Sequence, residues 1–139
     1  MNTSEHNTGA ATLLRAHGLR VTPQRLAICG RLLTRHRHAT PQQLFEELTG
    51  AFPSLSPNTV YLTLSQLETA GLVRRLHVGG QVVFDSNTTR HDHLYCRHCR
   101  RVTDWVAQGA DLPPPRVAGW TIDAQSRILA GTCPDCAAR

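Results

Sequence analysis

The chain has 139 residues, of which 40% are hydrophobic, so its length suits one domain or two very small ones. Fifteen Lys and Arg against ten Asp and Glu give a formal net charge of +5, which favours an anionic partner, with nucleic acid as the first candidate. No apolar run approaches the roughly 20 residues that cross a bilayer, and residues 1–9 lack a signal-peptide core. We therefore expect a cytoplasmic protein with no membrane partner.

Helix starts recur in the first 60 residues. A short leading helix is expected at residues 12–17, ended by Gly18. Three later helices each begin where a Ser or Thr directly precedes a Pro, because the hydroxyl can cap the helix and proline suits its first position. These pairs are Thr22-Pro23, Thr40-Pro41 and Ser56-Pro57. Thr40 and Gln43 also match a capping box.

The last of these helices, residues 57–70, is followed by two β-rich runs. Val60, Leu64 and Leu67 form its buried stripe, and Gly71 ends it. Residues 72–78 and 81–84 are joined by two glycines, which is typical of a tight hairpin. Helices followed by a small hairpin predict a winged helix-turn-helix, in which the last helix enters the DNA major groove. The alternative is a helical domain whose polar face is only solvated.

Four of the five cysteines form two Cys-x-x-Cys pairs, Cys96 with Cys99 and Cys133 with Cys136. This spacing suits tetrahedral Zn²⁺, and four thiolates leave no open position for substrate, so we expect a structural zinc site. A thioredoxin-type dithiol or unpaired cysteines are the alternatives. The fifth, Cys29, shares a helical face with Leu26 and Leu33 and is interpreted as core filler.

A second candidate metal site lies just before Cys96. On an extended strand His91 and His93 project to the same side, while Asp92 points away. Asp85 and Asp104 could add oxygen ligands, and residues 35–38 a further nitrogen. Nitrogen and carboxylate ligands without sulfur suit Fe²⁺, Mn²⁺, Zn²⁺, Co²⁺ or Ni²⁺.

Five stretches in order make the chain resemble the ferric uptake regulator family of metal-dependent repressors. They are residues 18–25 (GLRVTPQR), residues 56–64 (SPNTVYLTL) with 71–73 (GLV), Phe84-Asp85, residues 91–99 (HDHLYCRHC) and residues 131–136 (GTCPDC). The resemblance implies an N-terminal winged-helix domain and a C-terminal α/β dimerisation domain with the four-cysteine zinc site. It also implies a homodimer that binds a palindromic operator in double-stranded DNA when the sensor metal is present.

The resemblance also assigns residues to the sensor site. Its ligands would be His38, Asp85, His91, His93 and Asp104. His38 is preferred to His36 because it directly precedes Ala39-Thr40-Pro41, as the family histidine precedes its helix. Aspartate at both carboxylate positions looks like the peroxide-sensing branch, in which bound Fe²⁺ reacts with peroxide, oxidises a ligand histidine and releases DNA. Mn²⁺ would fill the site without that chemistry.

Candidate DNA contacts combine arginines before the recognition helix with residues on that helix. They are Arg15, Arg20, Arg25, Asn58, Thr59, Tyr61, Leu62 and Ser65, with Arg74 and Arg75 at the start of the wing. Many members have Arg where Leu62 stands, so an outward Leu62 could touch a thymine methyl instead.

Two further departures from the family pattern concern the C-terminal half. Gln125 replaces a histidine that often belongs to a third metal site, which argues against that site here. Pro113-Pro114-Pro115 makes the usual helix there brief or displaced. Dimerisation would then use the strands around Trp105 and residues 120–129.

Together these features predict an α+β protein, with a winged-helix DNA-binding domain at residues 1–84, a hinge at 85–90 and a dimerisation and metal-binding domain at 91–139. The predicted function is a metal-responsive repressor rather than an enzyme. Three alternatives stay open: a regulator that senses zinc or another metal, a hydrolase in which His91, His93 and Asp104 activate water, and a zinc-ribbon adaptor with no sensor.

Overall fold

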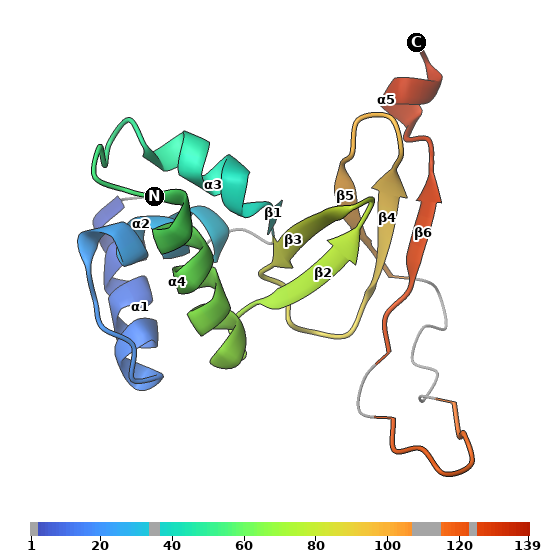
Figure 1. The fold of residues 1–139 in the computed structure, drawn as a ribbon, viewed down its shortest axis with the longest axis horizontal. Coiled ribbons are helices and arrows are strands. Elements are labelled where there is room, and N and C mark those ends of the chain that lie inside the picture. The colour runs from blue at the N-terminus through green and yellow to red at the C-terminus, as the bar shows by residue number, and fades with distance from the viewer. Residues whose placement is uncertain (1–2, 34–36, 107–114, 123–124) are drawn as a thin grey trace. The chain divides into compact units, whose positions relative to one another are not determined.

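The computed structural model describes residues 3–33, 37–106, 115–122 and 125–139 (Figure 1). The chain forms two compact units, Met1–Thr88 and Thr89–Arg139, called unit 1 and unit 2 below. Each is described by itself. In the described part of the chain no helix is long and apolar enough to cross a membrane.

Unit 1 contains the predicted proline-initiated helices. Its helices are α1 (Thr3–Ala16), α2 (Pro23–Leu32), α3 (Pro41–Leu48) and α4 (Pro57–Thr69). The hydroxyls of Thr22, Thr40 and Ser56 each accept a hydrogen bond from the amide three residues later, at 3.2, 3.1 and 3.1 Å. Gln43 completes the capping box by accepting from the Thr40 amide at 2.9 Å. The predicted starts of α2, α3 and α4 are thus confirmed.

The leading helix is longer than predicted. It begins at Thr3 rather than near residue 12, and its first turns carry neither a Ser-Pro or Thr-Pro start nor an apolar stripe from which that beginning could be predicted. Among residues 8–16 of this helix, Ala10 and Leu14, one helical turn apart, are buried. Gly18 ends the helix as predicted, at a φ of +69°, and the Leu19 amide donates to the Leu14 carbonyl at 2.8 Å.

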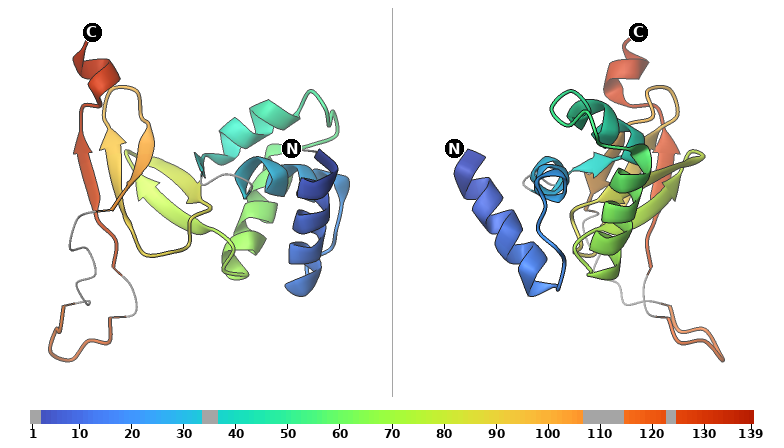
Figure 2. Two further views of the ribbon diagram at one scale, coloured as in Figure 1. Left: turned by 180° about the vertical axis from the view of Figure 1, so that it is seen from behind. Right: turned by 60° about the vertical axis from the view of Figure 1, so that its left-hand side comes forward.

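Unit 1 also contains a small antiparallel sheet, with one strand between α2 and α3 and two strands after α4 (Figures 1 and 2). It contains β1 (His38–Ala39), β2 (Arg74–Val78) and β3 (Gln81–Asp85), in the order β1-β3-β2. Gly79 and Gly80 join β2 to β3 with φ of +58° and +74°, the left-handed conformations that a two-residue hairpin turn requires. The predicted wing is confirmed, and β1 adds a third strand that places His38 opposite Asp85.

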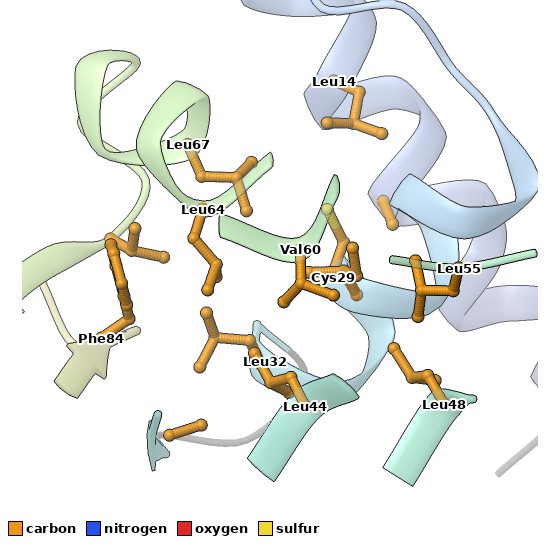
Figure 3. Close-up of a cluster of buried hydrophobic side chains, with 14 residues drawn as sticks. Leu14, Cys29, Leu32, Leu44, Leu48, Leu55, Val60, Leu64, Leu67 and Phe84 are labelled. Atoms are coloured by element: carbon orange, nitrogen blue, oxygen red, sulfur yellow. The ribbon is translucent and has the colours of Figure 1, made fainter. Parts of the chain in front are cut away.

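The core of unit 1 lies between the helices and β3 (Figure 3). Its fully buried apolar side chains are Leu14, Ile28, Leu32, Ala39, Leu44, Val60, Leu64, Leu67 and Phe84. Cys29 is also fully buried, and burial raises the pKa of its thiol to about 11. Its interpretation as core filler is therefore confirmed.

The described residues of unit 2 form a three-stranded sheet and one short helix. The elements are β4 (Asp92–Cys96), β5 (Val102–Trp105), β6 (Ile128–Gly131) and α5 (Pro134–Ala137). β4 lies in the middle, antiparallel to β5 and parallel to β6. Among its described residues only Tyr95 and Cys96 are buried hydrophobic side chains. A unit with so small an apolar core needs another source of stability.

The strand expected across residues 120–129 is shorter than predicted. β6 begins at Ile128, and Trp120 lies outside any strand with 74% of its surface exposed. Gly119 adopts a φ of +80° and the Trp120 amide donates to the Val117 carbonyl at 3.0 Å, so the chain turns tightly there instead of extending. Residues 115–122 and 125–127 contain no helix. Pro113 and Pro114 lie outside the described residues.

Candidate metal centres and recognition helix

The four paired cysteines of unit 2 converge on one point. Cys96 ends β4, Cys99 lies in the turn after it, and Cys133 and Cys136 belong to the start and body of α5. All four sulfur atoms lie within 4.8 Å of one another, and the Sγ atoms of Cys99 and Cys133 are 3.7 Å apart. Zn–S bonds of about 2.3 Å in a tetrahedron place sulfurs about 3.8 Å apart, so the cluster fits zinc.

Hydrogen bonds to the sulfurs favour their anionic form. The Cys133 amide donates to Cys96 Sγ at 3.3 Å, and backbone amides, that of Cys99 first, lower the pKa of Cys96 to about 5. A side-chain hydrogen bond with Cys133, followed by desolvation, raises the pKa of Cys136 to about 12, because the protonated thiol donates to the neighbouring sulfur and a thiolate cannot. The arrangement thus favours thiolates and needs a cation to hold all four.

Two arginines next to Cys99 shape this cluster. Arg101 Nη2 donates to Cys133 Sγ at 3.1 Å and to Asp135 Oδ2 at 2.5 Å, and the first contact lowers the pKa of Cys133. Arg100 has a φ of +63°, the one positive value among the described residues other than glycine. Its amide donates to the Cys96 carbonyl at 2.9 Å, so this conformation closes the turn that brings Cys99 back to Cys96.

A second group of ligand atoms in unit 2 lies on one face of the sheet. The rings of His91 and His93 are 4.4 Å apart between centroids, which confirms that they project to the same side. Asp104, on β5 opposite His93, places Oδ1 3.0 Å from His91 Nε2 and 3.7 Å from His93 Nε2. Asp92 instead binds Arg127 at 2.6 Å, which lowers the pKa of the Asp92 carboxyl.

The His91 tautomer makes this group a metal-ligand set. Its Nδ1 lies 2.7 Å from the Thr89 carbonyl, which can only accept, so Nδ1 carries the hydrogen and Nε2 presents a lone pair. In neutral His91, Nε2 and the Asp104 carboxylate are then two acceptors that face each other, so either a metal cation between them or a proton on Nε2 satisfies the pair. Metal bonds of about 2.0–2.2 Å bring neighbouring ligand atoms to roughly 3–3.5 Å, close to these separations.

Unit 1 offers a smaller set at the end of its sheet. His38 on β1 and Asp85 on β3 are paired in register, and His38 Nε2 lies 3.5 Å from Asp85 Oδ2. The Asp85 side chain is fully buried, and its Oδ1 accepts from the Asn87 amide at 2.8 Å, which fixes Oδ2 toward His38. His36, the alternative ligand, lies outside the described residues.

The predicted base-reading residues on α4 differ in how accessible they are. Tyr61 and Leu62 are 41% and 53% exposed, and Asn58 is exposed. Thr59 is half-buried and its hydroxyl lies 2.9 Å from the Ser56 hydroxyl, so it takes part in the cap of the helix. Ser65 is half-buried and accepts a hydrogen bond from Arg75 at 3.2 Å.

Of the predicted phosphate contacts, Arg15 and Arg20 are exposed. Arg25 is half-buried, and its guanidinium donates to Gln66 Oε1 at 2.6 Å and to the Arg20 carbonyl at 2.9 Å. Arg75 is likewise engaged within unit 1. The roles of Arg75, Arg101 and Arg127 were missed in the sequence, because a basic residue carries no signal of which side chain it will bind.

A winged helix followed by a four-cysteine cluster, with buried or half-buried histidine and carboxylate pairs in both units, defines a winged-helix protein with metal-binding residues. The chain belongs to the ferric uptake regulator family, whose sequence model matches residues 16–120.

Similar proteins are known in sequence and in structure. The peroxide-responsive repressor PerR of Staphylococcus epidermidis is 37% identical over 127 residues, covering 88% of this chain and 85% of the relative. The Vibrio cholerae ferric uptake regulator matches with a TM-score of 0.68 and 29% identity over 88% of this chain and 98% of that one. The Pseudomonas aeruginosa ferric uptake regulator with manganese matches with a TM-score of 0.66 and 27% identity over 90% and 98%.

Proposed function

We propose that this protein is a metal-responsive transcriptional repressor that binds operator DNA as a homodimer when a regulatory divalent metal is bound. The observation that carries the proposal is the group of buried His91 and His93 with half-buried Asp104, in which ligand atoms face one another at the spacing of a metal shell. Because the family and its PerR relatives are transcription regulators, the hydrolase alternative is set aside.

Two metals have separate roles in the proposal. Cys96, Cys99, Cys133 and Cys136 hold a structural Zn²⁺, which the four converging sulfurs support. The regulatory metal is held by five nitrogen and oxygen ligands: His38, Asp85, His91, His93 and Asp104. Donors of this kind suit Fe²⁺ or Mn²⁺, and also Zn²⁺. The structure of the Pseudomonas aeruginosa relative with manganese supports a divalent metal of this kind.

The proposed ligands come from a DNA-binding domain at residues 1–84, a hinge at 85–90 and a dimerisation domain at 91–139. A metal ion that takes ligands from both sides of the hinge binds best to one relative orientation of the domains, and linkage then requires DNA and metal to strengthen each other's binding. In this scheme α4 reads the operator with Asn58, Tyr61 and Leu62. A repressor of this type works in the cytoplasm.

The test compares DNA binding with and without the proposed ligands. Zinc-loaded wild-type protein is titrated with Mn²⁺ in the presence of a labelled duplex selected from a random library by the manganese-loaded chain. Binding should strengthen at least tenfold with Mn²⁺ in the wild type, within the usual range of allosteric coupling. It should not respond to Mn²⁺ in the His91→Ala, His93→Ala double variant.

His98→Ala is the matched control, because His98 is an exposed histidine of the same unit outside the proposed shell. It should respond to Mn²⁺ like the wild type. A double variant that still responds to Mn²⁺ in full contradicts the proposal.

Peroxide responsiveness is the finer part of the proposal, supported by the aspartates at both carboxylate positions and by the PerR relative. Fe²⁺ held by these residues would supply one electron to peroxide as its O–O bond breaks, and a ligand histidine would supply the remaining electron and be oxidised. The iron-loaded protein should therefore lose DNA binding after peroxide while the manganese-loaded protein retains it. If both forms retain binding, the regulator senses metal and not peroxide.

A further inference from the structure

Arg75 on β2 connects the wing to the recognition helix. Its Nη1 donates to the Tyr61 hydroxyl at 3.0 Å, and its Nη2 donates to the Ser65 hydroxyl at 3.2 Å. The same Nη2 forms an ion pair with Glu68 Oε2 at 2.7 Å. Three residues on successive turns of α4 are thus held by one guanidinium, a fork that lysine cannot reproduce.

Aromatic rings enclose the same guanidinium. Its carbon lies 5.4 Å from the centre of the Tyr61 ring and 5.2 Å from that of Phe84, and the two rings meet edge to face with centroids 6.4 Å apart. Phe84 is fully buried and pairs with Arg75 across the hairpin. Cation–π contact on both rings therefore fixes the guanidinium relative to the core of unit 1.

These contacts change what Arg75 can do for DNA. Glu68 compensates the charge of Arg75, and the Arg75 side chain is only 24% exposed. A guanidinium placed in this way is a poor phosphate contact, contrary to its expected role at the start of the wing. Its influence on DNA binding must pass through the side chains it holds.

The direction of the hydrogen bonds decides what Tyr61 presents. A guanidinium has no acceptor, so the Tyr61 oxygen accepts from Arg75 and its own O–H points elsewhere as a donor. Tyr61 is 41% exposed on α4, where a donor meets the acceptors of the major groove: O4 of thymine, N7 of adenine, and O6 or N7 of guanine.

We propose that Arg75 is a positioning residue for sequence reading, which holds the Tyr61 hydroxyl as a hydrogen-bond donor toward base-edge acceptors and contacts no phosphate itself. This inference rests on the proposed DNA-binding function.

The test uses Arg75→Lys, which keeps the charge but loses the fork, and Arg75→Gln, which loses both. The full, manganese-loaded chain is titrated with the duplex that the wild type selects from a random library and with a scrambled duplex, each over a range of salt concentrations. Both variants should bind the selected duplex roughly tenfold more weakly, as expected for loss of a charge-assisted hydrogen bond. Binding to the scrambled duplex and the salt dependence should match the wild type.

Tyr61→Phe separates the positioning role from a general loss of structure. It removes only the hydroxyl, and it should weaken binding to the selected duplex by a similar factor. Adding Arg75→Lys to Tyr61→Phe should then have less effect than Arg75→Lys alone, because both changes remove one interaction. Far-UV circular dichroism checks folding, and if the Arg75 variants do not fold, Tyr61→Phe with normal binding overturns the inference.

Other results also overturn it. If Arg75→Lys binds the selected duplex like the wild type, or if Arg75→Gln weakens both duplexes equally and lowers the salt slope by about one unit, Arg75 is a phosphate contact. If the wild type selects no duplex at all, the proposed function itself has failed. If the wild type discriminates between the two duplexes and the Arg75 variants discriminate equally well, only the inference about Arg75 has failed.

Discussion

Replacing Cys136 by serine is expected to release zinc and unfold unit 2. The variant removes one of four sulfurs that lie within 4.8 Å of one another, and with it the site that the proposed zinc occupies. Serine is almost the same size as cysteine, so a loss of structure would reflect the lost thiolate ligand and not a lost volume.

The magnitude follows from how little apolar surface unit 2 buries. Tyr95 and Cys96 are the buried hydrophobic side chains among its described residues. A large buried side chain contributes about 1.5–3 kcal/mol, whereas ordering the backbone costs about 1–2 kcal/mol for every residue. Structural zinc sites contribute about 10–16 kcal/mol of binding free energy, which becomes folding free energy when the site forms only in the folded chain. Loss of zinc should therefore outweigh the rest of the unit's stability.

The assay combines metal analysis with tryptophan fluorescence, because both tryptophans, Trp105 and Trp120, belong to unit 2. Wild-type protein should contain one tightly held zinc per chain. Cys136→Ser should contain much less zinc and show a red shift in the emission of half-buried Trp105, since Trp120 is already exposed in the folded chain. Cys29→Ala is the matched control, since it removes a buried thiol of unit 1 and should retain its zinc. Native emission from a zinc-free Cys136→Ser protein would show that unit 2 folds without zinc.

Three further substitutions have defined expected outcomes. Arg100→Gly should raise the stability of the zinc-loaded protein by about 1 kcal/mol in thermal unfolding, because glycine adopts a positive φ without strain, and no gain over Arg100→Ala would count against it. Phe84→Ala should lower the free energy of unfolding of unit 1 by about 3–5 kcal/mol in urea titrations followed by far-UV circular dichroism, and a loss below 1 kcal/mol would be inconsistent with full burial. A hydrogen bond from Arg37 lowers the pKa of Glu47. The pair therefore stabilises the fold above the carboxyl pKa of the unfolded chain, and this contribution is lost as pH falls through the lowered pKa of the folded chain. Glu47→Gln should reduce the acid sensitivity of thermal unfolding, and an unchanged pH profile would argue against it.

Much of unit 1 could be predicted from its sequence because its signals are local. Thr22, Thr40 and Ser56 cap helices within three residues of themselves, and Gly79-Gly80 requires only its own backbone conformation. The beginning of α1 had no such signal. β1 is two residues long and exists because it pairs with β3, which is a contact between distant parts of the chain.

The candidate metal ligands were also predictable from the sequence only where the signal is local. The Cys-x-x-Cys spacing and the alternation of His91 and His93 are local, and both correspond to the observed geometry. Arg101, in contrast, reaches Cys133 and Asp135 across more than thirty residues of sequence. Long-range partners of this kind depend on the folded sheet.

In the proposed function, a metal ion held by the histidine and aspartate ligands controls DNA binding. A titration of Mn²⁺ into the zinc-loaded protein tests this when metal occupancy and the anisotropy of a labelled, selected duplex are recorded on the same sample. DNA binding should rise in proportion to the filling of one exchangeable site per chain, beyond the zinc. Full DNA binding before any Mn²⁺ is added, with that site empty, would contradict it.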